Sequence, residues 1–467
     1  MRICLLVPDG TGLRNYLYSS FVDHFAEHDE VVLYTTLSDE ILQELKKLHP
    51  DRTFTYQRMP IYGESFTGKL LKEAITYARL RYNTQLDDNP TTMINWTRKK
   101  YKGATRLFFV LAAFIGRLTF GRYKGILFLE SWYKKVLGRS SFVAGQKDVL
   151  REMSPDVLFC THQRSIDASA VVEAASQLGI PSVGAVYSWD NLPKARLLVR
   201  SEYYVVWSQF MKEEMNKYYP EIPDTQIAIT GTPQFEFYHR PDWHLSKNEF
   251  CEKTGLDPQK KIICFSGNDL TFPCDDLYLR DVAEMLMEMP GPERPQLLLR
   301  RCPVDLSGRF EKVVKEYPGL IKVSDPLWKS YKGGWDSIVP TPEDVALLVN
   351  VSLHSDAVIN VGSTMAHDFA VFDKPAIYIN YDQPEVTSWS ARVNNQYQQF
   401  RSMPAGDCVI WLNGKEEIVS AVNKALHQPS EVAQSRGDWF RNVVLHPVTE
   451  ASKNLASYCL SVANRKN

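Results

Sequence analysis

The chain lacks any pair of cysteines in a C-x-x-C spacing, and its eight cysteines are scattered between Cys4 and Cys459. Several of them lie within apolar runs, where a reduced thiol behaves as a small hydrophobic side chain. A disulfide framework would call for a more regular spacing. This distribution therefore favours a reducing, cytoplasmic environment.

The sequence also lacks a long apolar run. Nothing in it approaches the roughly 20 continuous apolar residues of a membrane-spanning helix. The first apolar run, Ile3–Val7, is followed at once by proline and aspartate, so it is too short for the apolar region of a signal peptide. We therefore expect a first β-strand there, in a cytoplasmic protein that is not integral to a membrane.

Neither sign of charge is in excess. The chain carries 54 Lys and Arg against 55 Asp and Glu, so bulk charge indicates no nucleic-acid partner. Its 44% hydrophobic and 23% charged residues are typical of a globular protein. With 467 residues, it exceeds the size at which one core keeps growing, which predicts two domains of roughly 200 residues each.

Strand patterns and helix patterns alternate along both halves of the chain, which predicts an α/β fold with parallel sheets and right-handed crossovers. In the first half the expected strands are Ile3–Val7, Val31–Thr35, Val157–Cys160, Ser182–Val186, Tyr203–Val206 and Ile227–Ile229. In the second half they are Ile262–Phe265, Gln296–Leu299, Ile321–Val323, Ala357–Ile359 and Cys408–Leu412. Helices are expected over Leu13–His28, Asp39–His49, about Ile166–Leu178, Gln209–Tyr218 and Trp439–Val462.

These patterns also predict the domain organisation. We expect a first Rossmann-like domain over residues 1–232, with a basic, aromatic, helical insert at about 61–145. The proline-rich, aromatic stretch 233–258 has no clean period and is interpreted as a linker. A second Rossmann-like domain is expected over 259–430, followed by a C-terminal helical segment, 431–467, that packs on the first domain.

The segment Ser355–Ile379 carries the clearest functional pattern, a strand, a small-residue turn, a helix opening and a second strand. Gly362 permits close backbone approach, Ser363 and Thr364 offer hydroxyls and an N-cap, and Asp368 follows one turn later. Backbone N–H groups at such a turn suit a phosphate, so a nucleotide diphosphate fits the pattern. The alternative is an ordinary strand–helix unit whose hydroxyls only cap the helix.

Ligands of open parallel sheets bind outside the carboxyl ends of the strands, so the polar turns after strands are the candidate sites. In the first domain these turns contain Gly10, Gly12, Arg164 and Asn191. In the second domain they contain Ser266, Gly267 and Arg300, and Glu343 lies in the first turn of a helix that Thr341 opens. The run Asp9–Gly12 lacks the third glycine of a dinucleotide-binding loop, which argues against that ligand.

Several segments together resemble the GT-B glycosyltransferases that build bacterial surface polysaccharides such as capsule, lipopolysaccharide and teichoic-acid-like polymers. The matching segments are Val205–Phe210, Ile229–Phe235 (ITGTPQF), Arg300–Pro303 (RRCP) and Asp356–Pro375, which contains GSTMAHD and FDKP. The resemblance implies the GT-B fold, in which two Rossmann-like domains face each other across a cleft and a C-terminal helix crosses back to the first. It also implies a nucleotide-sugar donor in the second domain and a glycan or lipid-linked glycan acceptor in the first.

The resemblance further implies roles for single residues. Ser363 and Thr364 would contact the donor phosphates, and Arg300 would neutralise diphosphate charge with its planar guanidinium. Asp368 occupies a position where the family often has a glutamate that binds ribose. Cys302 stands where many relatives have histidine, so no role is transferred to it.

Glycosyl transfer needs a group that takes the proton of the acceptor hydroxyl and positive charge or dipoles that stabilise the leaving group. No Asp-x-Asp pair occurs, so we expect a metal-independent enzyme with the nucleotide sugar as substrate and no cofactor. Asp9, His162 and Asp190 are the three candidates for the base. Histidine titrates near neutrality without help, whereas either aspartate would need burial or a partner.

The insert contains no Asp or Glu between Asn89 and Leu129 but eight Lys and Arg, and it includes the apolar run Leu107–Ile115. A basic helix with an apolar face and aromatic neighbours is typical of elements that lie on an anionic membrane surface. We therefore expect peripheral contact with the inner leaflet of the cytoplasmic membrane. The alternative is a buried helix with a solvated, charged rim.

Three other functions stay open at this level. A nucleotide-sugar 2-epimerase shares the fold, but such enzymes resemble one another through an acidic, glycine-rich turn that this chain replaces with Val361–Met365. A transferase of glycerol phosphate or ribitol phosphate would bind a cytidine diphosphate donor between paired domains. A non-catalytic nucleotide-binding scaffold would keep the phosphate turn without needing Asp9, His162 or Asp190.

Overall fold

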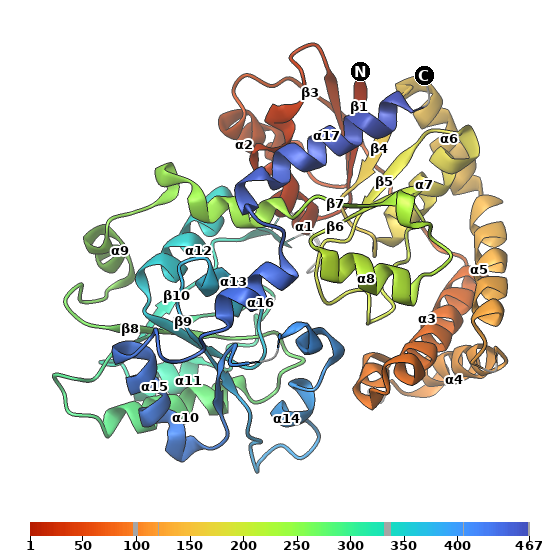
Figure 1. Cartoon of the computed structure of the whole chain (residues 1–467). Coiled ribbons are helices and arrows are strands. Elements are labelled where there is room, and N and C mark those ends of the chain that lie inside the picture. Colours follow the sequence, from red (N-terminus) through yellow and green to blue (C-terminus); the bar gives the residue numbers. More distant parts are fainter. Residues whose placement is uncertain (97–100, 120, 331–337, 405, 466–467) are drawn as a thin grey trace. The chain divides into compact units, whose positions relative to one another are not determined.

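The computed structural model of the chain describes residues 1–96, 101–119, 121–330, 338–404 and 406–465 (Figure 1). It divides into two compact units, the first made of Met1–Gln234 with Val443–Asn467 and the second of Phe235–Asn442. Each unit is built on an open parallel sheet, so the predicted α/β class with two Rossmann-like domains is confirmed. The stretch 233–258 forms two 3-10 helices and the helix α9 (Lys247–Thr254).

The first unit contains a seven-stranded sheet in the order β3-β2-β1-β4-β5-β6-β7, and all its pairings are parallel. Its strands are β1 (Arg2–Val7), β2 (Glu30–Thr35), β3 (Phe54–Arg58), β4 (Val157–Cys160), β5 (Ser182–Ala185), β6 (Tyr203–Val206) and β7 (Ile227–Ile229). Every residue of β4 and β5 is buried, as expected for central strands that are covered on both faces. The sequence pattern missed β3, because only its first residue is buried.

The helices that follow these strands agree with the predictions except for the first one. The helices α2 (Glu40–Leu48), α7 (Ile166–Leu178) and α8 (Gln209–Tyr218) form as expected. The continuous helix predicted over Leu13–His28 is wrong, because α1 (Gly10–Gly12) leads into a short π-helix and then a 3-10 helix. Ser19 lies between these two with an extended backbone, and its hydroxyl accepts a hydrogen bond from the N–H of Phe21 at 3.3 Å.

The insert between β3 and β4 is helical. It consists of α3 (Phe66–Asp87), α4 (Gly103–Arg117), α5 (Tyr123–Gly138) and α6 (Ser141–Met153), drawn in orange and gold in Figure 1. Gly116 of α4 lies against α3 so closely that a Cβ there would come within 2.7 Å of the Ala74 carbonyl oxygen. The alternative of a wholly buried α4 is wrong, because Leu107, Val110 and Phe114 are exposed.

The C-terminal segment forms two helices where one was predicted. They are α16 (Arg436–Val443) and α17 (Ala451–Asn464), and Pro447, which cannot continue a helix, lies between them. Within the first unit α17 packs against the 3-10 helix Ser20–His24 and against β4. The predicted return of the C-terminal helix to the first domain is therefore confirmed.

The second unit contains a six-stranded parallel sheet in the order β10-β9-β8-β13-β14-β15. Its strands are β8 (Ile262–Ser266), β9 (Gln296–Arg300), β10 (Ile321–Ser324), β13 (Ala357–Asn360), β14 (Ala376–Ile379) and β15 (Ile410–Leu412). A small antiparallel pair, β11 (Lys329–Ser330) and β12 (Ile338–Val339), lies apart from it. The helices are α10 (Asp275–Met287), α11 (Glu311–Glu316), α12 (Pro342–His354), α13 (Met365–Ala370), α14 (Ala391–Asn394) and α15 (Ile418–His427).

Candidate active site

The strand order of the first unit brings two of the predicted catalytic residues together. β1 and β4 are neighbours in the sheet, and the strands that continue from them run to opposite edges, so the order reverses between them. Such a switch point opens a crevice at the carboxyl ends of the strands, which is where ligands of open α/β sheets bind. Asp9 follows β1 and His162 follows β4, so both residues lie at this point.

Asp9 uses its two carboxylate oxygens differently. Oδ1 accepts hydrogen bonds from the N–H groups of Thr11 at 3.0 Å and Gly12 at 3.2 Å, which caps α1. Oδ2 accepts a hydrogen bond from Nδ1 of His162. Burial alone would raise the pKa of Asp9, but the interaction with His162 and the two backbone donors outweigh it and hold the pKa below its usual value. Asp9 is therefore a carboxylate that orients the imidazole.

The other ring nitrogen of His162, Nε2, is buried and has no hydrogen-bond partner among the described residues. With the Nδ1 proton directed at Asp9, a neutral His162 presents the Nε2 lone pair, which is the tautomer that a general base needs. The ring of Tyr187 contacts the imidazole edge to face, with the ring centroids 4.3 Å apart. Asp9 and His162, which the sequence offered as alternative bases, thus form one pair.

Arg164 and Asn191, both predicted on the acceptor side, also lie together. The Arg164 guanidinium donates to Asn191 Oδ1 at 3.2 Å and to the Tyr187 hydroxyl at 3.0 Å. Nδ2 of Asn191 and Nε2 of Gln163 are buried donors without a partner in the part of the chain that the structure describes. Buried polar groups in this state are rare in proteins and are expected where a ligand binds. Sequence reasoning gave no role to Tyr187 or Gln163, although Gln163 lies in the polar turn that contains Arg164 and Tyr187 immediately precedes the turn that contains Asn191.

Asp190, the third candidate base, has polar partners of its own, Lys194 and Ser188. Its carboxylate forms an ion pair with Lys194 and accepts a hydrogen bond from the Ser188 hydroxyl at 2.6 Å. Burial opposes ionisation, yet Lys194 and Ser188 keep the pKa of Asp190 below its usual value. An aspartate held in this way is a weak base.

Gly10 and Gly12 are both buried in α1. A Cβ on Gly12 would lie 2.1 Å from Oγ1 of Thr161, so this glycine allows the start of α1 to pack against the end of β4. That contact holds Asp9 next to His162.

The second unit has the same kind of switch point, between β8 and β13. Gly362 follows β13 with a φ of +61°, where a Cβ would also approach Phe400 and Asn394 to within 2.8 Å. The N–H of Ser363 donates to Asn360 Oδ1 at 2.8 Å, and that of Met365 donates to Ser363 Oγ at 3.4 Å. These two amides are thus already engaged, and Ser363 supplies the local side-chain cap that was also expected from Thr364.

Around this turn three asparagine side chains carry unpaired polar atoms. Nδ2 of Asn360, Nδ2 of Asn394 and Oδ1 of Asn395 are buried and have no partner among the residues described. Asn394 and Asn395 adjoin the position that a Cβ of Gly362 would occupy. The sequence gave no signal for the last two, because they come from α14 and its end, about 30 residues downstream.

The remaining predicted donor-side residues lie at the same carboxyl edge or near it, with contacts of their own. Ser266 is buried at the end of β8, and Gly267 packs under Phe310, whose ring would be 2.9 Å from a Cβ. Asp368 is buried and accepts a hydrogen bond from the Tyr238 hydroxyl at 2.7 Å.

Arg300 is held inside the second unit. Its guanidinium forms an ion pair of 2.7 Å with Asp344 in the first turn of α12, and both side chains are almost fully buried. Asp344 also accepts from the indole N–H of Trp328 at 2.7 Å. Glu343, next to Asp344, is exposed. A guanidinium in this setting organises the end of β9, and its contact with a phosphate stays a prediction.

Within the described ranges, no group of three or more His, Cys, Asp or Glu side chains is arranged to hold a metal ion. Across the same ranges, no helix has the length and apolar character needed to cross a bilayer.

No protein-family model matches the chain, and no curated protein matches its sequence. Solved structures match its fold. A UDP-GlcNAc 2-epimerase from Methanocaldococcus jannaschii has a TM-score of 0.54 and 10% identity, over 98% of this chain and 100% of its own. A glycosyltransferase from Rickettsia africae has a TM-score of 0.52 and 10% identity, over 99% and 98%. A UDP-GlcNAc 2-epimerase from Neisseria meningitidis, bound to UDP-GlcNAc, has a TM-score of 0.50 and 10% identity, over 99% and 100%. At these identities the similarity shows the fold, which is of the GT-B type.

Proposed function

We propose that this protein is a glycosyltransferase of the GT-B type, which moves a sugar from a nucleotide sugar to a hydroxyl group of a surface glycan. The single observation that carries the proposal is the His162–Asp9 pair at the switch point of the first unit, with Nε2 buried and unpaired. The fold supports it, because solved proteins of this fold include a glycosyltransferase and an enzyme bound to UDP-GlcNAc.

In this reaction the acceptor oxygen bonds to the anomeric carbon of the sugar while the bond from that carbon to the phosphate oxygen breaks. The acceptor proton passes to Nε2 of His162, and Asp9 stabilises the imidazolium that forms. The nucleotide phosphate leaves with the electron pair of the broken bond. We assign the donor to the polar turn Gly362–Thr364 of the second unit, whose surrounding asparagine amides can donate to phosphate or ribose oxygens. No metal ion takes part in the proposed step.

The test follows the release of nucleotide from a panel of nucleotide sugars, with lipid-linked glycans extracted from membranes as acceptors. We expect one sugar nucleotide to release its nucleotide in the presence of the extract. Replacing His162 by alanine should lower the rate by about 10²-fold or more, the usual contribution of general base catalysis. His28, which is exposed in the same unit, is the matched control, and His28→Ala should retain the wild-type rate.

Nucleotide binding is measured separately by thermal shift. A nucleotide that binds only the folded protein stabilises it by about 2.7 kcal/mol at 100 times its dissociation constant.

Conversion of the sugar to its 2-epimer without nucleotide release would refute the proposal and favour an epimerase. Transfer from a cytidine diphosphate polyol would refute it in favour of a polyol-phosphate transferase, and an unchanged glycan product after loss of Asp9, His162 and Asp190 would favour a scaffold.

The acceptor in this proposal is lipid-linked, and a surface of the insert supports contact with an anionic inner leaflet. Along α4 the exposed apolar side chains recur every three or four residues, which places them on one helix face: Leu107, Val110, Leu111, Phe114 and Leu118. Phe128 and Trp132 of α5 are exposed as well and contact each other. An exposed apolar patch of this kind is typical of interaction surfaces.

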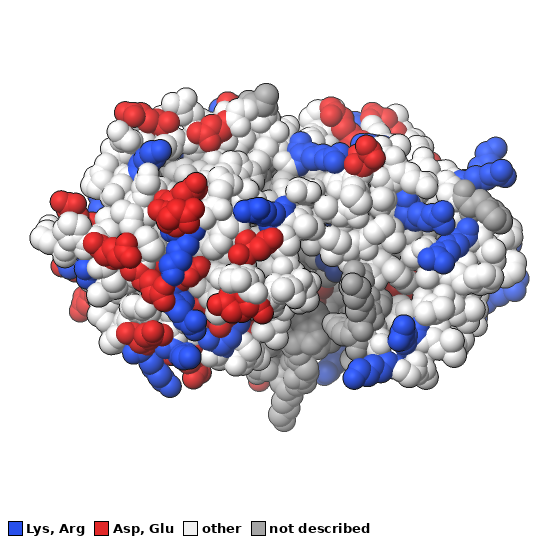
Figure 2. Space-filling model, turned by 90° about the horizontal axis from the view of Figure 1, so that it is seen from below, with Lys and Arg blue, Asp and Glu red and all other residues white. Residues whose placement is uncertain are grey.

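Basic side chains accompany this apolar face. Lys102, Arg106, Arg117 and Lys124 are exposed, and no acidic residue occurs from Asn89 to Leu129. On the right of Figure 2, the side on which α4 lies in Figure 1, Lys and Arg stand on a surface that is otherwise largely uncharged. Each basic residue near an anionic leaflet contributes about 1 kcal/mol. Arg98, Lys99 and Lys100 also belong to the predicted basic segment but lie outside the described residues.

Sedimentation with anionic liposomes tests this surface. The double variant Leu111→Glu/Phe114→Glu should lose binding at every salt concentration, whereas Lys102→Glu/Arg106→Glu should weaken binding most at low salt, where screening is least. Reversal of Arg98, Lys99, Lys100 and Lys102 together should abolish it. Binding that is indifferent to these changes would discard membrane contact and leave the transferase proposal standing.

A further inference from the structure

The first unit contains a large cavity that the proposed chemistry does not use. Its volume is about 710 Å³, within the usual range of ligand-binding pockets. It lies between α3 and α5 of the insert on one side and α7 with the chain leading to β6 on the other. The connection from β5 to β6, in which every residue is described, contains no α-helix, and residues of α3 and α5 line the cavity together with Ser182 of β5 and Tyr204 of β6.

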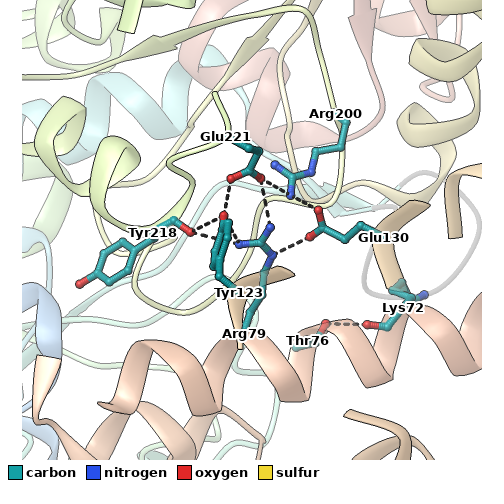
Figure 3. A network of polar contacts seen from close by, with 8 residues as sticks. All are labelled: Lys72, Thr76, Arg79, Tyr123, Glu130, Arg200, Tyr218 and Glu221. Atoms are coloured by element: carbon teal, nitrogen blue, oxygen red, sulfur yellow. Dashed lines mark hydrogen bonds and ion pairs between the residues drawn. The ribbon is translucent and has the colours of Figure 1, made fainter. Parts of the chain in front are cut away.

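Several charged groups in the cavity wall are paired with one another. Figure 3 shows the main network, in which Arg79 binds Glu130 at 2.6 Å and Glu221 at 3.1 Å, and Arg200 binds the same two carboxylates at 2.7 and 3.1 Å. Elsewhere in the wall, Lys72 pairs with Glu64 at 2.5 Å. Charges that are paired in this way offer little to a phosphate or to a cation, and an ionic wall disfavours a hydrocarbon chain.

The rest of the lining suits an uncharged ligand rich in hydroxyl groups. Five serines line the cavity: Ser131, Ser169, Ser176, Ser182 and Ser201. Ser201 is 8% exposed, and its Oγ has no hydrogen-bond partner within the described part of the chain. Leu127, Leu197 and Tyr204 add apolar surface, against which the C–H faces of sugar rings can pack. Sites of this composition combine packing with hydrogen bonds that fix orientation.

The cavity reaches the candidate base through Arg164. Its lining extends along α7 from Ile166 at the start to Ile180 beyond the end, a helix of 13 residues and so about 20 Å long. Arg164 lines the cavity and donates to the Tyr187 hydroxyl, and the Tyr187 ring contacts His162. Arg164 and Tyr187 thus link one end of the cavity to His162.

We propose that this cavity binds the non-reacting part of the acceptor, a segment of two or more uncharged sugar residues, and that the terminal hydroxyl is thereby presented to His162. This inference rests on the proposed function, because it assigns the acceptor of that reaction. It adds the substrate class: an acceptor already extended as a neutral oligosaccharide.

The test measures binding to an array of neutral oligosaccharides, acidic oligosaccharides and plain alkyl chains. The variant Thr76→Trp places an indole in the cavity from α3. Thr84→Trp is the matched control, because Thr84 lies two turns further along the same helix, its hydroxyl donates to the carbonyl four residues earlier as that of Thr76 does, and it does not line the cavity. We expect a neutral oligosaccharide to bind the wild type and Thr84→Trp equally and Thr76→Trp at least tenfold more weakly.

A second variant guards against misfolding. Ser131 is exposed at the rim on α5, so Ser131→Trp should narrow the entrance without disturbing the core, and it should also weaken binding at least tenfold. The inference is overturned if no neutral oligosaccharide binds the wild type, or if only acidic oligosaccharides or alkyl chains bind it. It is also overturned if Thr76→Trp and Ser131→Trp both bind the oligosaccharide as tightly as the control Thr84→Trp. His162→Ala should release nucleotide at least about 10²-fold more slowly yet bind the oligosaccharide normally. If the wild type binds the oligosaccharide but releases no nucleotide, the transferase proposal is refuted while the glycan site stands.

Discussion

The ion network in Figure 3 ties the insert to the sheet, and its removal should cost measurable stability. The carboxylate of Glu130 on α5 forms ion pairs with Arg79 on α3 and with Arg200 in the segment before β6. One side chain therefore connects α5, α3 and the segment that leads into β6. We consider the replacement Glu130→Gln, which keeps the shape of the side chain and removes its charge.

The magnitude follows from the titration of Glu130. Burial would raise its pKa, but Arg200 and Arg79 outweigh burial and lower the pKa from 4.5 to about 2. At 1.36 kcal/mol per pKa unit, the ionised form contributes about 3 kcal/mol to the folded state at pH 7. Because the folded pKa is depressed, this contribution is complete above the unfolded pKa, falls to about half near pH 3 and is lost as the pH falls through 2.

The assay is denaturant unfolding at pH 7 and pH 3, together with a thermal melt at pH 7. Glu130→Gln should lower the free energy of unfolding by about 3 kcal/mol at pH 7, which is about 6 to 12 °C in the melting temperature of a unit of this size. Glu152→Gln is the matched control, because Glu152 is exposed on α6 of the same insert. A loss under about 0.5 kcal/mol at pH 7, or a loss equally large at pH 3, would refute the reasoning.

Three further predictions concern the site and the packing. Asp9→Asn should leave the fold intact but lower the rate of nucleotide release by at least tenfold, with a changed pH profile, because an amide no longer holds the His162 proton on Nδ1; an unchanged rate would contradict the pair. Gly116→Val should destabilise the first unit by about 2 kcal/mol in denaturant unfolding, because the new side chain meets the backbone of α3 at Ala74, whereas a neutral effect would argue against this helix contact. Burial raises the pKa of Asp275 from 3.8 to about 7, so the protonated form is favoured in the fold and stability is lost as the pH rises from about 4 to 7. In urea titrations, the free energy of unfolding of Asp275→Asn should therefore rise relative to that of the wild type between pH 5 and pH 8. A difference in unfolding free energy that stays constant over this range would count against the raised pKa.

The sheets could be predicted from the sequence because central parallel strands are buried on both faces. Every residue of Val157–Cys160 and Ala357–Asn360 is buried, and all are apolar except Asn360 at the end of the second strand. Where one side is exposed the signal fades, as in Phe54–Arg58. The insert was predicted to be helical, but without the bounds of its four helices, because α4 exposes apolar residues that a simple amphipathic pattern would bury.

The candidate site was predictable residue by residue but not as an arrangement. Asp9 and His162 stand 153 positions apart, and no spacing rule indicates that β1 and β4 become neighbours. The same holds for Arg300 and Asp344, which lie 44 positions apart. A polar turn after a strand predicts an edge of the sheet, whereas the partner of each side chain depends on the order of the strands.

This dependence explains why one arginine at a strand end is a poor indicator of phosphate. A buried guanidinium must be paired, and in the second unit the nearest carboxylate, Asp344, is supplied by the fold itself. Nε2 of His162 is in the opposite situation, since the chain places it at a switch point and gives it no partner within the described residues. Folding satisfies a buried polar group wherever it can. The groups that folding leaves unpaired at the carboxyl edge, rather than the most strongly charged ones, are therefore the better guide to where this protein binds its substrate.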